Sequence, residues 1–379
     1  MENNKVVFSN GFQEAMSRKT SIPDILKVFA VLSVMMHGIL GTLTKQNLPV
    51  DQLAQSVVLL DLLKYSAPFF IFAICFDISK IKGVPYKTHV FHKVKELLVP
   101  YFLWSTVYIL MDLSRYQSAS DVLGGYLLGN NAPHTWYLVM MFQFHLLVPV
   151  LWYLHRKLAE KSRRIGPVLL VAFVFYIAFV YYYDHYIFGG ATNKALLYLD
   201  RSFIGFSIYA ILGTVASSNV EKWESFISKA KLVVLPFMCI FFLIANYEMF
   251  SYGMDHIKLS NSLYLRVSTF CYDVLAIIAV YGFGLVLIKN KSRLLIPFRF
   301  LAQYAYRAYL ANFFFIAILI KLMGVPANSL PYGFHLFFLW LMTAILSFAL
   351  VYGIEFALKY LPGYLKGQNT KEKQQSVQE

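Results

Sequence analysis

Charged residues are scarce in this chain. Asp, Glu, Lys and Arg make up only 14% of its 379 residues, whereas 58% are hydrophobic. A soluble globular protein has roughly 25% charged and about 45–50% apolar residues. The mean hydropathy of +0.56 agrees with this excess of apolar residues. The composition therefore excludes an ordinary soluble protein and predicts an all-α, polytopic membrane protein.

Negative charge is the scarcer of the two signs. The chain has 20 acidic and 34 basic side chains, which gives a formal net charge of +14. In a soluble domain this excess would suggest a nucleic-acid partner, but here the basic residues gather in short segments between apolar runs. That pattern is a topology signal. We therefore expect no nucleic-acid partner, and lipid headgroups or an anionic cytosolic ligand are the secondary interpretations.

Cysteine is nearly absent. Cys75, Cys239 and Cys271 each lie within an apolar run, and an odd number of this kind predicts neither a disulfide framework nor a metal site. Residues 1–21 also lack the basic, apolar and small-residue succession of a cleavable signal peptide. We therefore expect the first apolar segment to remain as an anchor.

Apolar runs of about 20 residues, the length that crosses a bilayer, recur ten times. The expected spans are residues 24–44, 57–78, 97–114, 134–154, 166–184, 196–217, 231–250, 266–288, 297–320 and 333–358. Basic loops follow the second, fourth, sixth and eighth spans, and the basic tail follows the tenth. The positive-inside rule then places both termini in the cytoplasm of a multi-pass cell-membrane protein.

The loops leave no room for a soluble domain, because none exceeds about 20 residues on this reading. We expect one transmembrane domain over residues 22–362, a cytoplasmic segment over 1–21, and a polar, disordered cytoplasmic tail over 363–379. No internal repeat is evident, so carrier folds built from repeats are not favoured.

Lys27 and His37 are the notable polar residues of the first span. Lys27 could simply extend to the cytoplasmic interface while His37 bonds a neighbouring helix. Alternatively, Lys27 attracts an anion and neutral His37 serves as a base near pH 7. Ten helical residues at about 100° each end about 80° short of three full turns, so the side chains of Lys27 and His37 point to adjacent helical faces.

Other polar residues also lie in or beside the expected spans. Such groups are costly in lipid and are expected to face the bundle interior, a cavity or one another. They are His134, Trp136, Gln143 and His145 near the fourth span, Asp200 and Arg201 in the sixth, Asp273 in the eighth, and Arg307 and Asn312 in the ninth.

Several short stretches together carry a family resemblance. They are "DILKVFAVLSVMMH" at 24–37, "YSAPFFIFAICF" at 65–76, "HKVKELLVPYFLW" at 92–104, "HTWYL" at 134–138 and "QYAYRAYLAN" at 303–312. In this order they resemble the acyltransferase-3 family, whose members acylate sugars and cell-envelope polymers. Among the departures from the family pattern are Lys27, where the family has Arg, and Asn312, where it often has His. The Lys27 to His37 spacing is also one residue shorter than the family's.

The resemblance implies a reaction and roles. An acyl group, most simply acetyl, would move from a cytosolic acyl-coenzyme A to a hydroxyl of a sugar or cell-surface polysaccharide. His37 would be the general base, with His134 and Gln143 positioning or polarising the reactants. Lys27, Lys93 and Lys95 would attract the donor's phosphates, because lysine binds phosphate as a point charge. Trp136, His145 and Arg307 are further binding candidates.

The setting and the alternatives follow from the same resemblance. The expected partners are the glycan acceptor, the lipid bilayer and a polysaccharide synthase, in a bacterial plasma membrane. Similar ten-span proteins in exopolysaccharide adhesin operons have been assigned both roles, acyl transfer and export, so an exporter or flippase that makes no bond is the alternative function. A scaffold without substrate is a third, which the number of intramembrane ionisable groups disfavours.

Overall fold

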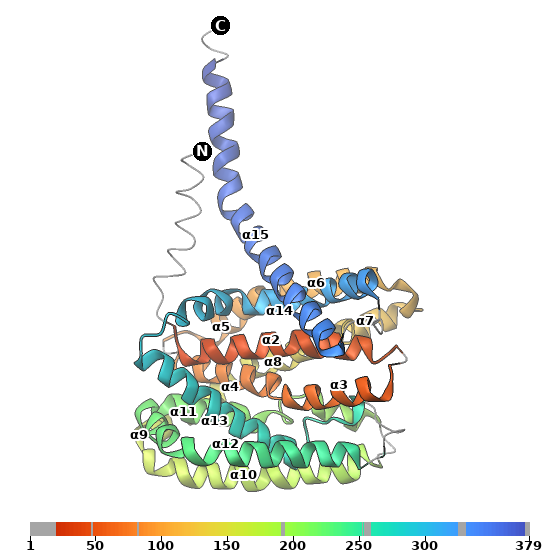
Figure 1. Cartoon of the computed structure of the whole chain (residues 1–379). Helices are drawn as coiled ribbons and strands as arrows, with labels where there is room; N and C mark the ends of the chain where they lie inside the picture. Colours follow the sequence, from red (N-terminus) through yellow and green to blue (C-terminus); the bar gives the residue numbers. More distant parts are fainter. Residues whose placement is uncertain are drawn as a thin grey trace.

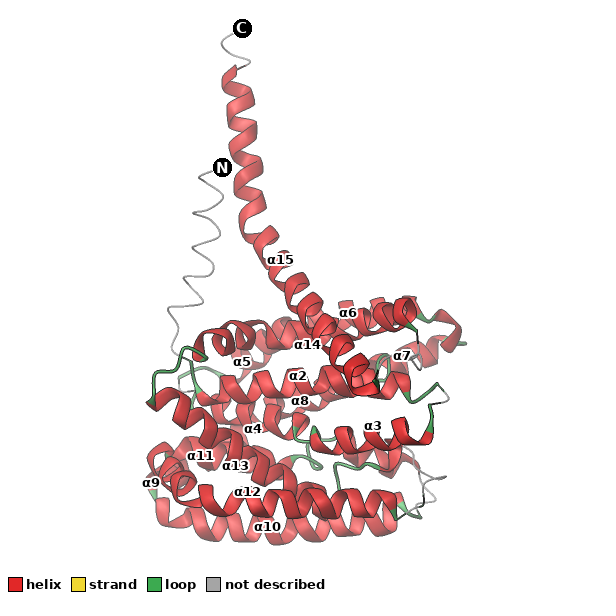
Figure 2. Cartoon of the chain, viewed as in Figure 1, coloured by secondary structure: helices red, strands yellow, loops and turns green. Residues whose placement is uncertain are grey.

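The computed structural model describes residues 20–46, 48–81, 83–190, 194–251, 253, 259–324 and 331–375. Within these ranges the regular structure is helical, with no strand (Figures 1 and 2). The all-α prediction is thus confirmed. Most of the predicted N-terminal segment, residues 1–19, lies outside the described residues, as does the end of the tail, residues 376–379.

The chain forms α-helices joined by short turns. In order they are α2 (Ile22–Leu43), α3 (Val50–Leu62), α4 (Ser66–Ile78), α5 (Tyr86–Lys93), α6 (Val99–Met111), α7 (Ala119–Leu128), α8 (Trp136–Leu146), α9 (Val148–Glu160), α10 (Ile165–Tyr182), α11 (Ser207–Ser218), α12 (Val220–Phe250), α13 (Val267–Lys289), α14 (Leu295–Met323) and α15 (Tyr332–Gln375). Short π-helical or 3₁₀ segments connect some of them, including η1 (Val94–Leu98), η3 (Ser162–Arg164), η4 (Tyr183–Phe188) and η5 (Lys194–Arg201).

Eight helical segments of the described chain are long and apolar enough to cross a membrane. A ninth results if α8 and α9, which bend by 58° at Leu147, count as one span. Pro149 lies in the first turn of α9, where its missing N–H is tolerated, and this explains why the expected fourth span is broken there.

The expected sixth span, residues 196–217, is not one long helix. It consists of the 3₁₀ segment η5 followed by α11, which has only 12 residues. The chain still passes between the two ends of the bundle here: Arg201 lines a cavity at one end, and Ser217 bonds His155 near the other. The crossing is made by a shorter helix than the hydropathy pattern indicated.

The basic loops gather at one end of the bundle, which we call the basic end. Thr20, before α2, donates to Leu295 at the start of α14. Lys222 at the start of α12 donates to Ser162 after α9. The indole of Trp152 donates to the carbonyl of Ile78 at the end of α4. We call the other end, where α2, α6 and α14 finish and α8 begins, the opposite end.

Helices α2 and α4 form the centre of the bundle. α2 packs against α4, α13, α14 and α15, and α4 packs against α11, so the first and second expected spans are the most enclosed (Figure 1). Helix α10 instead exposes large apolar side chains such as Leu170, Val174 and Phe175. Apolar side chains exposed along a membrane helix face lipid without cost.

Two prolines affect the start of α4 and the start of α6. Pro68 lies in the first turn of α4, where its missing N–H is tolerated. Pro100 cannot donate to the carbonyl of Glu96, and the turn before it is the π-helical η1, in which Val99 donates to Val94. Single π turns of this type commonly lie at functional sites.

The predicted disordered tail differs from the structure. α15 continues as helix to Gln375 and extends beyond the bundle (Figure 1). Lys, Glu and Gln, which are common in this segment, favour helix, and extending an existing helix avoids the cost of nucleation.

The contact between α4 and α11 allows a stability prediction. A Cβ at Gly213 would meet the carbonyl oxygen of Phe72 and lie 3.0 Å from the amide nitrogen of Phe76. Gly213→Ala should therefore destabilise the bundle by about 1–3 kcal/mol, the usual cost of overpacking. Thermal unfolding in detergent measures this. Gly166→Ala is the control, since nothing lies within 4 Å of that Cβ. Equal unfolding temperatures for both variants would contradict the close packing.

Candidate active site

His37 lies in the C-terminal half of α2. The helix starts at a capping box in which Ser21 and Asp24 bond each other's backbone amides, so Asp24 has a structural role. From there His37 projects towards the junction of α3 and α4. Its Nε2 lies 3.3 Å from the carbonyl oxygen of Leu60, and its Nδ1 lies 3.4 Å from the hydroxyl of Ser66.

These two contacts define the roles of the ring nitrogens. A backbone carbonyl can only accept a hydrogen bond, so Nε2 must carry the proton that Leu60 accepts. In the neutral ring the lone pair is then on Nδ1, which faces the hydroxyl of Ser66. Nδ1 is therefore the nitrogen that can take a proton.

Several polar residues lie near the His37 imidazole inside the bundle. The hydroxyl of Tyr264 lies 3.3 Å from that of Ser66, and the ammonium of Lys64 lies 4.5 Å from the centre of the Tyr264 ring. Lys64 donates to the carbonyl of Ser262 at 2.5 Å, and the hydroxyl of Ser262 donates to Asp61. A cation and a carboxylate thus accompany His37 inside the bundle.

A cavity of about 240 Å³ lies at the basic end. Three of the predicted binding residues line it, namely Lys27 from α2, Lys93 from α5 and His145 from α8. Phe70, Tyr137 and Tyr309 form its apolar inner surface. The structure therefore brings together side chains that are far apart in the sequence.

Both lysines of this cavity are paired with carboxylates. Lys27 Nζ lies 2.6 Å from an oxygen of Asp77, and Lys93 Nζ lies 2.6 Å from an oxygen of Glu96. Asp77 and Glu96 line the same cavity. A phosphate would thus have to take the place of a carboxylate on each lysine.

His145 contacts a second histidine beside the cavity, and Lys95 lies outside the cavity. His145 Nδ1 is 3.3 Å from Nε2 of His89, and the two rings lie 5.5 Å apart. Lys95 is exposed, and its ammonium lies over the ring of Phe91 rather than in the cavity. Of the predicted donor-binding lysines, Lys27 and Lys93 thus share a cavity and Lys95 does not.

A second cavity of about 510 Å³ lies at the opposite end. It is more polar, and the residues that line it include Trp136, Asn130, Asn131, Arg115 and Arg201. Gly41 lies in its wall, about 21 Å along α2 from Lys27 at about 1.5 Å per residue. The two cavities therefore occupy opposite ends of the same helices.

His134 lies between the two cavities, before the start of α8. Its ring centroid is 4.9 Å from that of Tyr309, which lines the basic-end cavity. It is 5.8 Å from that of Tyr108, which lines the opposite-end cavity. His134 is buried, and its Nε2 has no hydrogen-bond partner among the described residues.

Trp136 links His37 to the opposite-end cavity. The indole ring of Trp136 lies 6.0 Å from the ring of Tyr264, whose hydroxyl is close to Ser66 and hence to His37. Lys27 and His37 do not contact each other, and they do not line the same described cavity. This agrees with the helical angle between them.

Two further candidates are held in structural contacts. The side-chain oxygen of Gln143 accepts from the backbone N–H of Phe203 at 2.9 Å. Arg307 forms an ion pair with Glu355 at 2.7 Å, on a largely exposed face. Neither residue lines the two cavities described above. The partner of Arg307 is thus Glu355, a residue outside the set of polar residues that the sequence analysis named.

Sequence reasoning missed several residues that the structure places around His37. Lys64 and Asp61 are buried charges inside the second span, and intramembrane charge alone could have marked them. Ser66 and Tyr264 carry no such signal, since hydroxyl side chains are common in membrane helices. Asp77 could be recognised as the partner of Lys27 only from the packing of α2 against α4.

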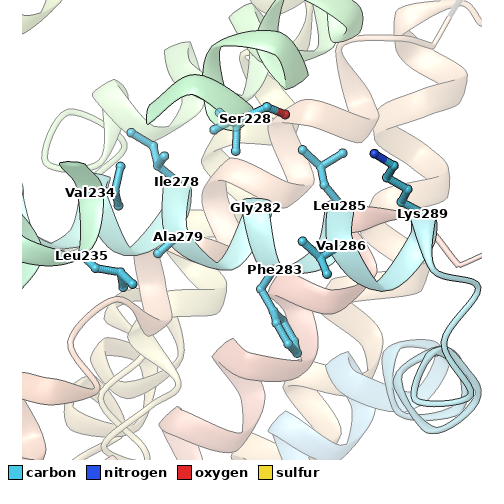
Figure 3. A pocket seen from close by; sticks show the side chains of 11 residues that line it. Ser228, Val234, Leu235, Ile278, Ala279, Gly282, Phe283, Leu285, Val286 and Lys289 are labelled. Atoms are coloured by element: carbon cyan, nitrogen blue, oxygen red, sulfur yellow. The ribbon is translucent and has the colours of Figure 1, made fainter. Parts of the chain in front are cut away.

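A further cavity lies between α12 and α13 and differs in character (Figure 3). Its volume is about 410 Å³, and its wall is mainly aliphatic, with Ser228 and Lys289 as polar members. None of the predicted site residues lines it. The described residues also include no group of three or more His, Cys, Asp or Glu side chains arranged to hold a metal ion.

Comparison with known proteins supports one assignment. The family profile described as an acyltransferase domain, that of the acyltransferase-3 family, matches residues 21–355, nearly the whole chain. No curated protein and no solved structure matches the chain. The profile covers both cavities, His37 and the helices between them. This membrane protein therefore belongs to the acyltransferase-3 family and is an acyltransferase.

Proposed function

We propose that the protein transfers an acyl group, most simply acetyl, from an acyl-coenzyme A to a hydroxyl of a sugar or cell-surface polysaccharide. The main support is the pair of cavities at opposite ends of the same helices, with His134 between them and His37 connected to this region through Tyr264. A transferase that takes its donor and acceptor from opposite sides of a membrane needs such an arrangement.

The donor is proposed to enter at the basic end, which the positive-inside rule places in the cytosol of a bacterial plasma membrane. Coenzyme A carries phosphates, and Lys27 and Lys93 are the cations of the cavity there. The ion pairs with Asp77 and Glu96 neutralise the positive charges of Lys27 and Lys93 until a phosphate replaces the carboxylates.

The proposed chemistry uses Nδ1 of His37. This nitrogen takes the proton of the acceptor hydroxyl, whose oxygen attacks the thioester carbonyl carbon. The carbon–sulfur bond then breaks, and the thiolate leaves and regains the proton from the imidazolium. The hydrogen bond from Nε2 to Leu60 keeps the neutral ring in the tautomer that can begin this sequence.

Removal of the base should abolish transfer. In nanodiscs supplied with radiolabelled acetyl-coenzyme A and candidate glycans, His37→Ala should lower kcat/KM by about 10²–10⁴-fold, the usual contribution of a general base. His185→Ala is the matched control, because that ring stacks on Tyr181 at the protein surface. Wild-type rates in His37→Ala would rule out this base. Movement of glycan across the membrane without acylation would favour an exporter.

Donor binding should depend on the partners of the lysines. If Lys27 exchanges Asp77 for a phosphate, Asp77→Asn should tighten coenzyme A binding and Lys27→Met should weaken it. Each change is expected to be about two- to fivefold, the scale of one partly exposed ion pair. Calorimetric titration with coenzyme A measures both. Lys157→Met, at the same end but paired with Glu160, should leave binding unchanged. Weaker binding in both Asp77→Asn and Lys27→Met would instead indicate a purely structural ion pair.

A further inference from the structure

The opposite-end cavity carries an excess of positive charge. Its described lining includes three cations, Lys45, Arg115 and Arg201, and one carboxylate, Asp112. Asp112 accepts a hydrogen bond from Ser114 at 2.8 Å. Two of the three cations are arginines, whose planar guanidinium groups can bind a carboxylate or phosphate through two parallel hydrogen bonds.

Arg201 is held in place by its neighbours. Its Nη1 donates to the side-chain oxygen of Asn130 at 2.6 Å, and its Nε lies 3.7 Å from Asp200. Asp200 offsets part of this charge but does not line the cavity. The excess of positive charge in the cavity therefore remains when Asp200 is counted, with three cations against two carboxylates.

Asn131 supplies an independent sign of a ligand. This residue is 5% exposed and lines the cavity, and its side-chain oxygen accepts from the hydroxyl of Tyr116 at 3.0 Å. Its Nδ2 has no hydrogen-bond partner among the described residues. An unmet buried donor costs about 1–3 kcal/mol, so an acceptor atom supplied by a ligand would stabilise the site.

The backbone around Asn131 is shaped to hold it there. A Cβ at Gly125 would collide with the side-chain oxygen of Asn131, so only glycine leaves room for this amide. Gly129 has a φ of +66°, and a Cβ there would lie 2.7 Å from the backbone nitrogen of Trp136. The hydroxyl of Thr135 then closes the turn by donating to the carbonyl of Gly129 at 2.8 Å.

We infer that the opposite-end cavity binds a carbohydrate that carries an acidic group, a carboxylate or a phosphate, as the acceptor. Arg115 and Arg201 bind the acid, Asn131 donates to an oxygen of the sugar, and Trp136 offers a flat apolar face to the ring. This inference rests on the proposed function, since it names the class of its acceptor. An anionic phospholipid headgroup has the same acid chemistry, and the test separates the two.

The test uses oligogalacturonate and its carboxyl-reduced, neutral counterpart, with the full-length protein in phosphatidylcholine nanodiscs. Binding of phosphatidylglycerol by the same preparation is measured in parallel. Equilibrium binding is measured without any acyl donor, and acyl transfer is measured separately. Wild-type protein should bind the acidic oligosaccharide at least about fivefold more tightly, as expected for one ion pair of about 1 kcal/mol. The preference should fall as salt is added, because screening weakens exposed charge pairs.

Substitutions in the cavity test which residues cause the preference for the acidic oligosaccharide. Arg115→Gln and Arg201→Gln should each remove most of the preference and leave the neutral oligosaccharide unaffected. Asn131→Asp, which keeps the shape but replaces the donor by an acceptor, should weaken both oligosaccharides. Arg115 is exposed, so Arg115→Gln tests the charge without disturbing the fold. Arg164→Gln, exposed at the basic end, is the control and should change nothing.

Three results would overturn the inference: equal binding of the two oligosaccharides by wild-type protein, an equal effect of the Arg variants on both, or Arg-dependent binding of phosphatidylglycerol in preference to oligogalacturonate. Arg-dependent binding of the acidic oligosaccharide without transfer to any glycan would keep the acidic site and reject the transferase. Transfer to neutral glycans alone would keep the transferase and reject the acidic acceptor.

Discussion

The hydrogen bond between His37 and the carbonyl of Leu60 is the interaction on which the proposed site depends. α3 ends at Leu62 and α4 begins at Ser66. At this break the carbonyl of Leu60 accepts from the backbone N–H of Leu63 at 3.2 Å and from Nε2 of His37 at 3.3 Å. Because Nε2 donates, Nδ1 is left as the basic nitrogen. A helix break and a base are thus parts of one arrangement.

The second constraint is the cost of charge in a bilayer. Lys27 pairs with Asp77, Lys93 with Glu96, Arg307 with Glu355, and Arg266 with Asp184. Each pair joins residues that a membrane would otherwise exclude. At the basic end these pairs also make the basic-end cavity nearly neutral, so the proposed donor phosphate would have to compete with carboxylates. At the opposite end the cavity keeps an excess of positive charge, which distinguishes the two binding regions chemically.

Much of the fold could be predicted because its signals are local. Apolar run length located the helices, and the alternation of basic loops located one end of the bundle. The angle between Lys27 and His37 followed from helical periodicity alone. The 12-residue α11 could not be anticipated, because a close approach of Gly205 to the carbonyl of Leu199 shapes the chain before it, and hydropathy does not record this.

The site was less predictable, because its contacts join distant segments. Lys27 and Asp77 are 50 residues apart, and Ser66 and Tyr264 are 198 apart. No periodicity links such pairs, since helix packing decides them. Lys64 and Asp61 did carry a signal, a charge within an apolar span, that could have been used. Asn131 did not, because its importance depends on an unmet donor beside a cavity.

The most direct measurement of the central claim is one of sidedness. Purified protein is sealed into liposomes with an acceptor oligosaccharide inside, and acetyl-coenzyme A labelled with carbon-13 in the acetyl group is added outside only. Mass spectrometry then determines whether the enclosed glycan gains the labelled acetyl group. The account predicts labelled glycan inside the vesicles with wild-type protein and none with His37→Ala. Unlabelled glycan that leaves the vesicles, or labelling that persists in His37→Ala, would contradict it.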